Sequence, residues 1–190
     1  MYIGLDCETG GIGDGISLLE VFFGIYDSRL TLQDQLLLKV KPDDDIYKVQ
    51  AEGLSVNRIN LIEHDKIAIP YKQAKTPLYE FLKKNSQNGK IKLVPIGHHV
   101  DGDIRWVCQN LISREAWEHN CSYRKLDTGT IAQFLKLKGI IPDDVSGSLS
   151  SLAKYYDLSF NGSAHEARAD VDMTVQILRK MVKDEELAIM

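Results

Sequence analysis

The chain has 190 residues, of which 44% are apolar and 26% are charged, and its formal net charge is −4. This length and composition are typical of a globular protein that buries its own core, and we expect residues 1–190 to form a single domain. They exclude a helical membrane span, because no apolar run approaches the roughly 20 residues that cross a bilayer. They also disfavour a protein that coats long nucleic acids, which usually carries a dense basic face.

The N-terminal residues show neither a basic segment nor a cleavage site, and they enter a strand-like pattern at once. The odd number of cysteines, Cys7, Cys108 and Cys121, and their lack of metal-ligand spacing favour reduced thiols. We therefore expect a cytoplasmic protein without a membrane partner.

Three strand-like segments open the chain. Residues 1–7, 17–26 and 31–40 are rich in β-branched, aromatic and other apolar types, and a glycine-rich turn separates the first two. Residues 41–75 are less regular. Further along, the pattern predicts helices at 55–62, 76–84, 103–112, 128–138 and 149–156, and strands at 91–96 and near 122–126.

The last helix has the clearest start. Ser163 and Glu166 are spaced as a capping box. An apolar stripe then follows at Ala167, Val171, Val175, Leu178 and Val182. The order of elements predicts an α/β fold whose mixed five-stranded sheet combines an antiparallel meander with parallel crossovers and is flanked by helices.

Asp6 and Glu8 form the first candidate site. Residues two apart on a strand face the same side, with Cα atoms roughly 6–7 Å apart. Two buried carboxylates are costly unless a cation joins them, and Mg²⁺ prefers oxygen ligands. About one Asp-x-Glu is expected by chance in such a chain. The second copy, Asp184 and Glu186, lies in a charged segment where we expect both side chains to be solvated.

His165 and Asp170 belong to a second pattern, His-x-Ala-x-x-Asp. This pattern arises by chance in roughly 2% of chains with this composition. A capped helix with surface charge would account for Glu166 and Arg168. It accounts less well for Asp170, which directly precedes the apolar Val171.

The third pattern, at residues 97–104, follows a strand and opens a helix, a place where sites form in α/β sheets. Asp101 is a plausible N-cap, and Asp103 is a further candidate ligand. His98 and His99 invite a zinc site, but no third His or Cys stands at a suitable spacing.

Taken in their order along the chain, the three segments resemble the motifs of the DEDDh family of 3′→5′ exonucleases, which includes the proofreading epsilon subunit of bacterial DNA polymerase III, ribonuclease T and oligoribonuclease. Asp6 and Glu8 match the first motif, Asp-x-Glu-Thr-Thr-Gly-Leu. Asp103 falls at the last residue of the second, His-Asn-x-x-Phe-Asp, and His165 and Asp170 match the third.

The resemblance implies a ribonuclease-H-like fold and two Mg²⁺ or Mn²⁺ ions, with His165 as general base. The implied metal ligands are Asp6, Glu8, Asp103 and Asp170, and the implied substrate-binding residues are Thr9, Gly10, Ile12 and His99. Three departures, Gly10 for Thr, His99 for Asn and Gly102 for Phe, affect what the resemblance implies about the nucleotide pocket.

The implied reaction releases nucleoside 5′-monophosphates from the 3′ end of single-stranded nucleic acid, with DNA favoured over RNA. Alternatives are an exoribonuclease acting on short RNA or RNA 3′ ends, a silent nucleic-acid-binding or polymerase-accessory module, and a phosphohydrolase of small nucleotides. A homodimer and a polymerase or accessory partner both stay open.

Overall fold

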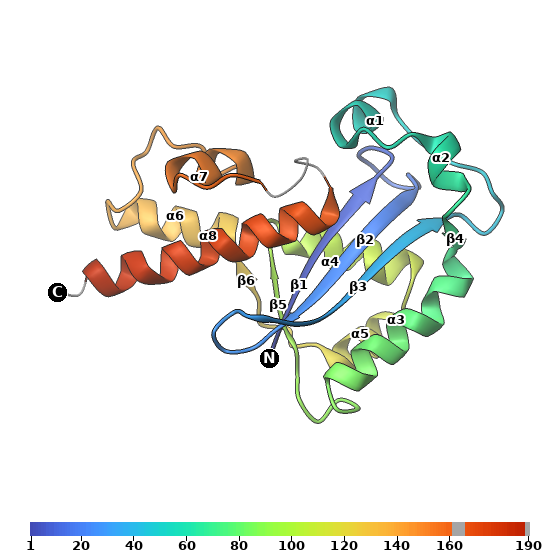
Figure 1. Cartoon of the computed structure of the whole chain (residues 1–190), viewed down its shortest axis with the longest axis horizontal. Helices are drawn as coiled ribbons and strands as arrows, with labels where there is room; N and C mark the ends of the chain where they lie inside the picture. The colour runs from blue at the N-terminus through green and yellow to red at the C-terminus, as the bar shows by residue number, and fades with distance from the viewer. Residues whose placement is uncertain (161–165, 189–190) are drawn as a thin grey trace.

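A mixed sheet forms the centre of the computed structural model, which describes the backbone of residues 1–160 and 166–188 and the side chains up to residue 183. The sheet has six strands in the order β4-β3-β2-β1-β5-β6 (Figure 1). Their bounds are β1 Tyr2–Thr9, β2 Leu18–Tyr26, β3 Leu32–Lys41, β4 Ile69–Pro70, β5 Val94–Gly97 and β6 Leu126–Asp127.

The predicted meander and crossovers are both present. β1, β2 and β3 pair antiparallel, while β5 runs parallel to β1 and β6 parallel to β5. The prediction of five strands was wrong, because β4 adds a sixth strand beside β3. A two-residue strand shows no alternation, so the sequence pattern could not reveal it.

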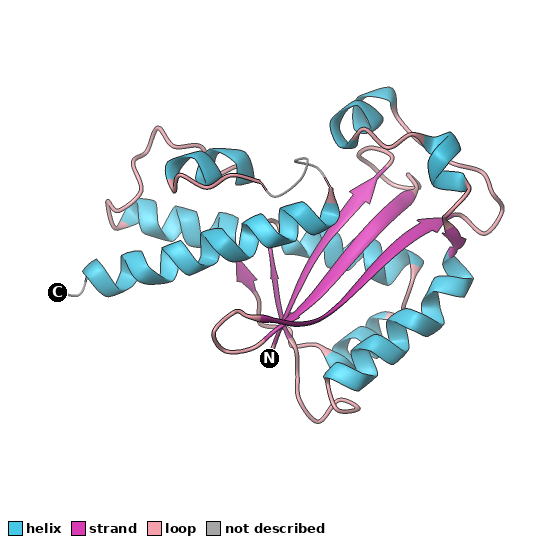
Figure 2. Cartoon of the chain, viewed as in Figure 1, coloured by secondary structure: helices cyan, strands magenta, loops and turns pink. Residues whose placement is uncertain are grey.

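Helices cover both faces of the sheet (Figure 2). Their bounds are α1 Ala51–Asn57, α2 Leu61–Asp65, α3 Tyr71–Asn85, α4 Val100–Asn110, α5 Arg114–Asn120, α6 Thr128–Leu137, α7 Leu149–Tyr155 and α8 Ala167–Ala188. Side chains of α3, α4 and α5 share one core with the strands, and α8 packs on the opposite face, with α6 and α7 against it. No helix of the described part of the chain is both long and apolar enough to cross a membrane.

The single helix predicted at 55–62 is two helices in the structure. α1 ends where Arg58 adopts a left-handed conformation, with φ 58°. α2 begins after Asn60, whose side chain accepts hydrogen bonds from the backbone of Ile62 and Glu63. A left-handed residue followed by a new N-cap interrupts a helix locally, and apolar periodicity does not register such a break.

The stripe on the last helix is largely confirmed. Ala167, Val171 and Leu178 are buried against the sheet, as is Val175, whereas Val182 is 51% exposed. α8 extends past the edge of the structure that it covers (Figure 1), so its last turns have less to pack against. The predicted capping residue, Ser163, lies outside the described residues.

Candidate metal centre

The approach of α8 to β1 depends on a glycine. A Cβ atom added to Gly4 would lie 2.8 Å from Cγ1 of Val171 and 2.9 Å from Cε2 of Tyr26. Because side chains alternate along a strand, positions 4, 6 and 8 of β1 face α8 together. The missing side chain at Gly4 thus lets the first turn of α8 lie directly on the strand that carries the first two acidic candidates.

Asp170 precedes Val171 on this turn and reaches the same place as Asp6 and Glu8. The carboxylate oxygens of these three residues lie within 4.8 Å of one another, and they are the only group of three potential metal ligands among the described residues. Three carboxylates at this separation repel one another strongly unless cations or protons intervene.

Asp103 borders this group from the opposite layer. It lies on the first turn of α4, and its backbone carbonyl is 3.7 Å from the thiol sulfur of Cys7 on β1. Asp103 is not one of the three residues that converge within 4.8 Å. Its charge still acts on Asp6 more strongly than that of any other side chain.

The electrostatics of the site favour a bound cation. Withdrawal from water and the charge of Asp103 raise the pKa of the Asp6 carboxyl well above its usual value. Burial, followed by the charges of Asp170 and Glu20, raises the pKa of Glu8 to about 8. Burial also raises the pKa of Asp103 to about 8, despite hydrogen bonds from Cys7 that favour its charged form. Protons therefore compete with cations for these oxygens near neutral pH.

The N-terminus of α4 corrects the prediction for Asp101. The helix begins at Val100, and its N-cap is His99 in a left-handed conformation, with φ 64°. The side chain of Asp127 accepts the backbone hydrogen bonds of Val100 and Thr130, each at 2.9 Å, and so caps α4 and α6 together. Asp101 is exposed and pairs with Lys125.

The adjacent residues His98 and His99 have different environments. Nδ1 of His98 lies 2.9 Å from the hydroxyl oxygen of Thr128, whereas its Nε2 is buried and has no hydrogen-bond partner within the part of the chain that the structure describes. His99 lines a separate cavity of about 580 Å³ together with Gly102 and Lys125. Neither histidine joins a group of three potential ligands among the described residues, so the structure offers no support for a zinc site there.

Three of the predicted substrate-binding residues surround the turn after β1. Thr9 and Ile12 line a cavity of about 230 Å³ next to Glu8, and Ile12 is 89% exposed. Gln50 holds the backbone of Ile12 by two hydrogen bonds, of 2.9 and 3.0 Å. Gly10 is not in the cavity wall. A Cβ there would lie 2.6 Å from Cγ1 of Val49, so Gly10 allows the segment before α1 to pack against the turn.

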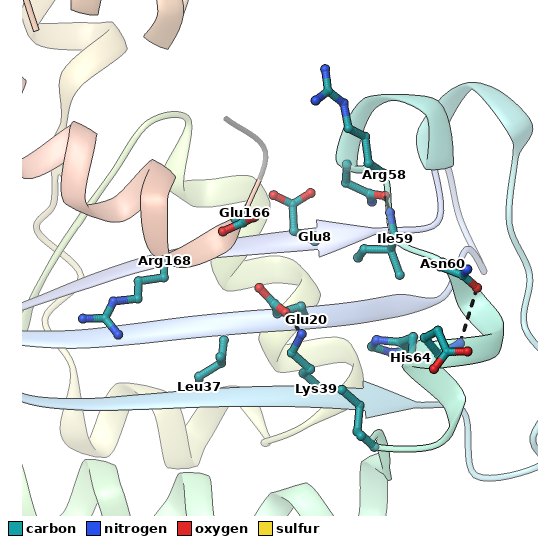
Figure 3. Close-up of a pocket in the computed structure, with 13 residues that line it drawn as sticks. Glu8, Glu20, Leu37, Lys39, Arg58, Ile59, Asn60, His64, Glu166 and Arg168 are labelled. Atoms are coloured by element: carbon teal, nitrogen blue, oxygen red, sulfur yellow. Dashed lines mark hydrogen bonds and ion pairs between the residues drawn. The ribbon is translucent and has the colours of Figure 1, made fainter. Parts of the chain in front are cut away.

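A second cavity, of about 380 Å³, opens on the other side of Glu8 (Figure 3). Glu20 and Lys39 form part of its wall, as do two cations, Arg58 and Arg168. None of these four residues occupies a defined position of a motif that predicts a functional role. One signal was available for Glu20, which is a lone charge within the apolar run of β2. His165 lies outside the described residues, whereas the adjacent Glu166 lines this cavity.

No known family model matches the sequence, and no curated protein matches it either. Several solved structures are similar to this chain. E. coli Exonuclease I with a dT13 oligonucleotide, and its zinc-bound form with single-stranded DNA, each give a TM-score of 0.71 at 16% identity. Each alignment covers 99% of this chain, and it covers 42% and 41% of those chains, respectively.

Two smaller proteins are similar as well. Exonuclease X, in complex with 5′-overhanging duplex DNA, has a TM-score of 0.63 and 16% identity, over 96% of this chain and 92% of that one. A 3′-exonuclease that recognises a histone mRNA stem-loop has a TM-score of 0.69 and 13% identity, over 96% and 63% of the respective chains. The present chain thus spans about two fifths of Exonuclease I. At these identities the likeness establishes the fold: this chain has the mixed α/β fold of these exonucleases.

Proposed function

We propose that this chain is a metal-dependent 3′→5′ exonuclease, with residues 1–190 acting as one exonuclease domain. The observation that carries the proposal is the convergence of Asp6, Glu8 and Asp170, with Asp103 beside them, on a fold shared with exonucleases. A structural role for such a partly buried acidic group is disfavoured, because the group costs folding free energy unless cations or protons neutralise it.

The donor set fits Mg²⁺ or Mn²⁺. All the proposed ligands, Asp6, Glu8, Asp103 and Asp170, offer carboxylate oxygen, which hard divalent cations prefer, and none offers sulfur or imidazole nitrogen. When bound, two such ions would polarise the phosphate and lower the pKa of the attacking water. Four carboxylates carry about the charge that two divalent cations neutralise.

The chain's own residues would do the remaining work. His165 would accept the proton of the attacking water as general base, a role worth roughly 10²–10⁴-fold in rate. Thr9, Gly10 and Ile12 would shape the site of the 3′-terminal nucleotide, for which the cavity beside Glu8 and the exposed apolar side chain of Ile12 are suited. His99, together with Lys125, would contact the strand on the other side of Asp103.

We favour single-stranded DNA as substrate, with nucleoside 5′-monophosphates as products, in a cytoplasmic setting. The similar exonucleases are bound to single-stranded DNA in one case and recognise an mRNA stem-loop in another. An exoribonuclease is therefore the second candidate. A homodimer or a polymerase or accessory partner is compatible with either activity, and a silent binding module is the remaining alternative.

The test compares digestion of matched single-stranded DNA and RNA oligomers labelled at the 5′ end. We expect stepwise shortening from the 3′ end that requires Mg²⁺ or Mn²⁺ and stops when a chelator is added. Release of phosphate from free nucleotides, but no shortening of oligomers, would instead identify a phosphohydrolase. Full activity in metal-free buffer would rule out the proposed mechanism.

A further inference from the structure

A row of charged side chains crosses the sheet next to the proposed centre. Glu8 on β1 stands opposite Glu20 on β2, and Glu20 stands opposite Lys39 on β3. Directly opposite residues of antiparallel strands share one face, with Cβ atoms about 4.5–5.5 Å apart. Figure 3 shows the three side chains on adjacent strands, with Lys39 directed toward Glu20.

The placement of Glu20 is unfavourable for the sheet alone. Like charges that stand directly opposite each other destabilise a strand pair, and Glu20 is only 8% exposed. The ammonium of Lys39 lies 3.2 Å from its carboxylate and offsets part of this cost. The lysine side chain is 39% exposed, so solvent weakens the attraction between Lys39 and Glu20 more than it weakens the repulsion between Glu20 and Glu8.

Glu20 is not placed as a ligand. The oxygens that converge within 4.8 Å belong to Asp6, Glu8 and Asp170, whereas the carboxylate of Glu20 forms an ion pair with Lys39. A carboxylate one strand away still adds negative potential at a cation beside Glu8, and a paired lysine reduces that potential. The row is thus arranged to adjust the field at the centre without filling a coordination position.

We propose that Glu20 is a positioning residue that strengthens divalent-cation binding at Glu8, and that Lys39 limits the strength of this effect. The proposal rests on the metal centre of the proposed function. It predicts that the two partners of one ion pair have opposite effects on cation affinity. A purely structural ion pair predicts the same effect from removing either partner, because each change breaks the same contact.

The experiment measures Mn²⁺ binding to the full chain without nucleic acid, from the electron paramagnetic resonance signal of free Mn²⁺ at low ionic strength. We expect Glu20→Gln to weaken binding by roughly tenfold, and Lys39→Gln to tighten it by a few-fold. The double variant should return toward the wild-type affinity. Thermal melting with a chelator checks that each variant is folded.

An ion pair between β3 and α3 supplies matched controls. Lys84 and Asp34 pair at 3.0 Å, and Asp34 faces Ile25, toward the end of the strands opposite to Glu8. Asp34→Asn and Lys84→Gln change the net charge by the same amounts and should leave Mn²⁺ affinity unchanged.

The outcomes separate the inference from the proposed function. Unchanged affinity in both Glu20→Gln and Lys39→Gln, or a change of the same sign in both, overturns the role of the row while the metal centre stands. If the Glu20 and Lys39 variants change Mn²⁺ affinity only as much as the Asp34 and Lys84 variants do, the effect comes from net charge alone, and the role of the row is also overturned. A wild-type chain that binds no Mn²⁺ removes the centre itself.

Discussion

Two aspartates on the first turn of α4 lie in contrasting environments. Asp103 borders the carboxylate group, whereas Asp101 is exposed and paired with Lys125. We expect Asp103→Asn to reduce kcat at least several-hundred-fold on a 5′-labelled oligomer, because removing one electrostatic contact to the transition state commonly costs ~10²–10³ in rate. Asp101→Asn is the control on the same helix and should keep near-wild-type activity. If Asp103→Asn also does so, Asp103 has no part in the centre.

The raised pKa values of Glu8 and Asp103, both about 8, determine how stability without metal depends on pH. Between about pH 4 and 8 the folded chain binds these protons more tightly than the unfolded chain does, so their contribution to stability is lost as pH rises. We expect Tm in chelator to fall by several degrees from pH 5 to 8.5.

Two comparisons test whether the raised pKa values of Glu8 and Asp103 cause this pH dependence of Tm. Glu8→Gln, which cannot ionise, should give a shallower fall in Tm than the wild type over the same pH range. Added Mn²⁺ should raise the wild-type Tm most at the upper end, where the oxygens are free of protons. A wild-type Tm that is constant or increases with pH in chelator would contradict the electrostatic description of the centre.

His165 is the residue whose proposed role separates an enzyme from a binding module. As a general base it acts in its neutral form, so the rate should rise with pH through the histidine titration and then level off. His165→Ala should lower the rate by roughly 10²–10⁴-fold. Oligomer affinity in Ca²⁺ should change little. An unchanged pH–rate curve in the variant would remove His165 from the mechanism.

The sequence patterns identified those candidate ligands whose positions depend on the local geometry of one strand or one helix. Strand alternation placed Asp6 and Glu8 on one face, and the stripe on the last helix placed Asp170 against the sheet. Glu20 was missed, because its position opposite Glu8 depends on the register between two strands, which no local pattern states. The prediction that Asp101 caps α4 was wrong for a related reason. The side chain that accepts the backbone hydrogen bond at the start of α4 is that of Asp127, which is distant in sequence.

At the level of elements, Gly4 links the fold to the site through the contact between β1 and α8. A Cβ atom at Gly4 would overlap Val171 and Tyr26, and overpacking of this kind typically costs about 1–3 kcal/mol. We expect Gly4→Ala to lower Tm and also kcat, since relief of the overlap displaces the turn that carries Asp170. Combining it with Val171→Ala, which removes one of the overlapping groups, should recover part of both.

The control for this prediction is a second glycine-to-alanine change. Apart from its chain neighbours and the backbone of α4 itself, a Cβ at Gly102 would meet no atom of the described residues within 4 Å. Replacing a helical glycine by alanine favours the helix by up to about 1 kcal/mol, so Gly102→Ala should leave Tm unchanged or raise it. Differential scanning calorimetry of both variants distinguishes the two cases. Equal Tm values for Gly4→Ala and the wild type would show that α8 adjusts at no cost.

Elements with long, regular patterns were predicted well, whereas short elements were predicted unevenly. The seven-residue α7 falls within the helix predicted at 149–156, but β4 and α5 were missed. The three strands of the meander and the buried stripe of α8 each repeat their signal over several residues. The two-residue β4 and the seven-residue α5 offer too little repetition, and α5 is identified mainly by the side chain of Ser113 capping the backbone of Ala116. Tertiary packing, which local periodicity does not encode, determines such pieces.

Considered as a whole molecule, the chain combines a net charge of −4 with a buried acidic centre, so long-range attraction of nucleic acid is weak. Cations that could contact a strand near the centre include Arg58 and Arg168, which line the cavity beside Glu8. For the proposed binding of a 3′ end we therefore expect few phosphate contacts, about 2–4 of them, and the salt dependence of binding follows that number.

This estimate is tested by measuring oligomer affinity in Ca²⁺ at several salt concentrations by fluorescence anisotropy. For single strands the slope of log affinity against log salt is roughly −0.7 per phosphate contact, so we expect a wild-type slope of about −1.5 to −3. Arg168→Gln should weaken binding and make the slope shallower by roughly 0.7. Arg29→Gln is the control, because the turn after β2 lies at the end of the strands opposite to Glu8. A slope that corresponds to ~8 or more contacts would indicate a long footprint and contradict the short 3′-end grip.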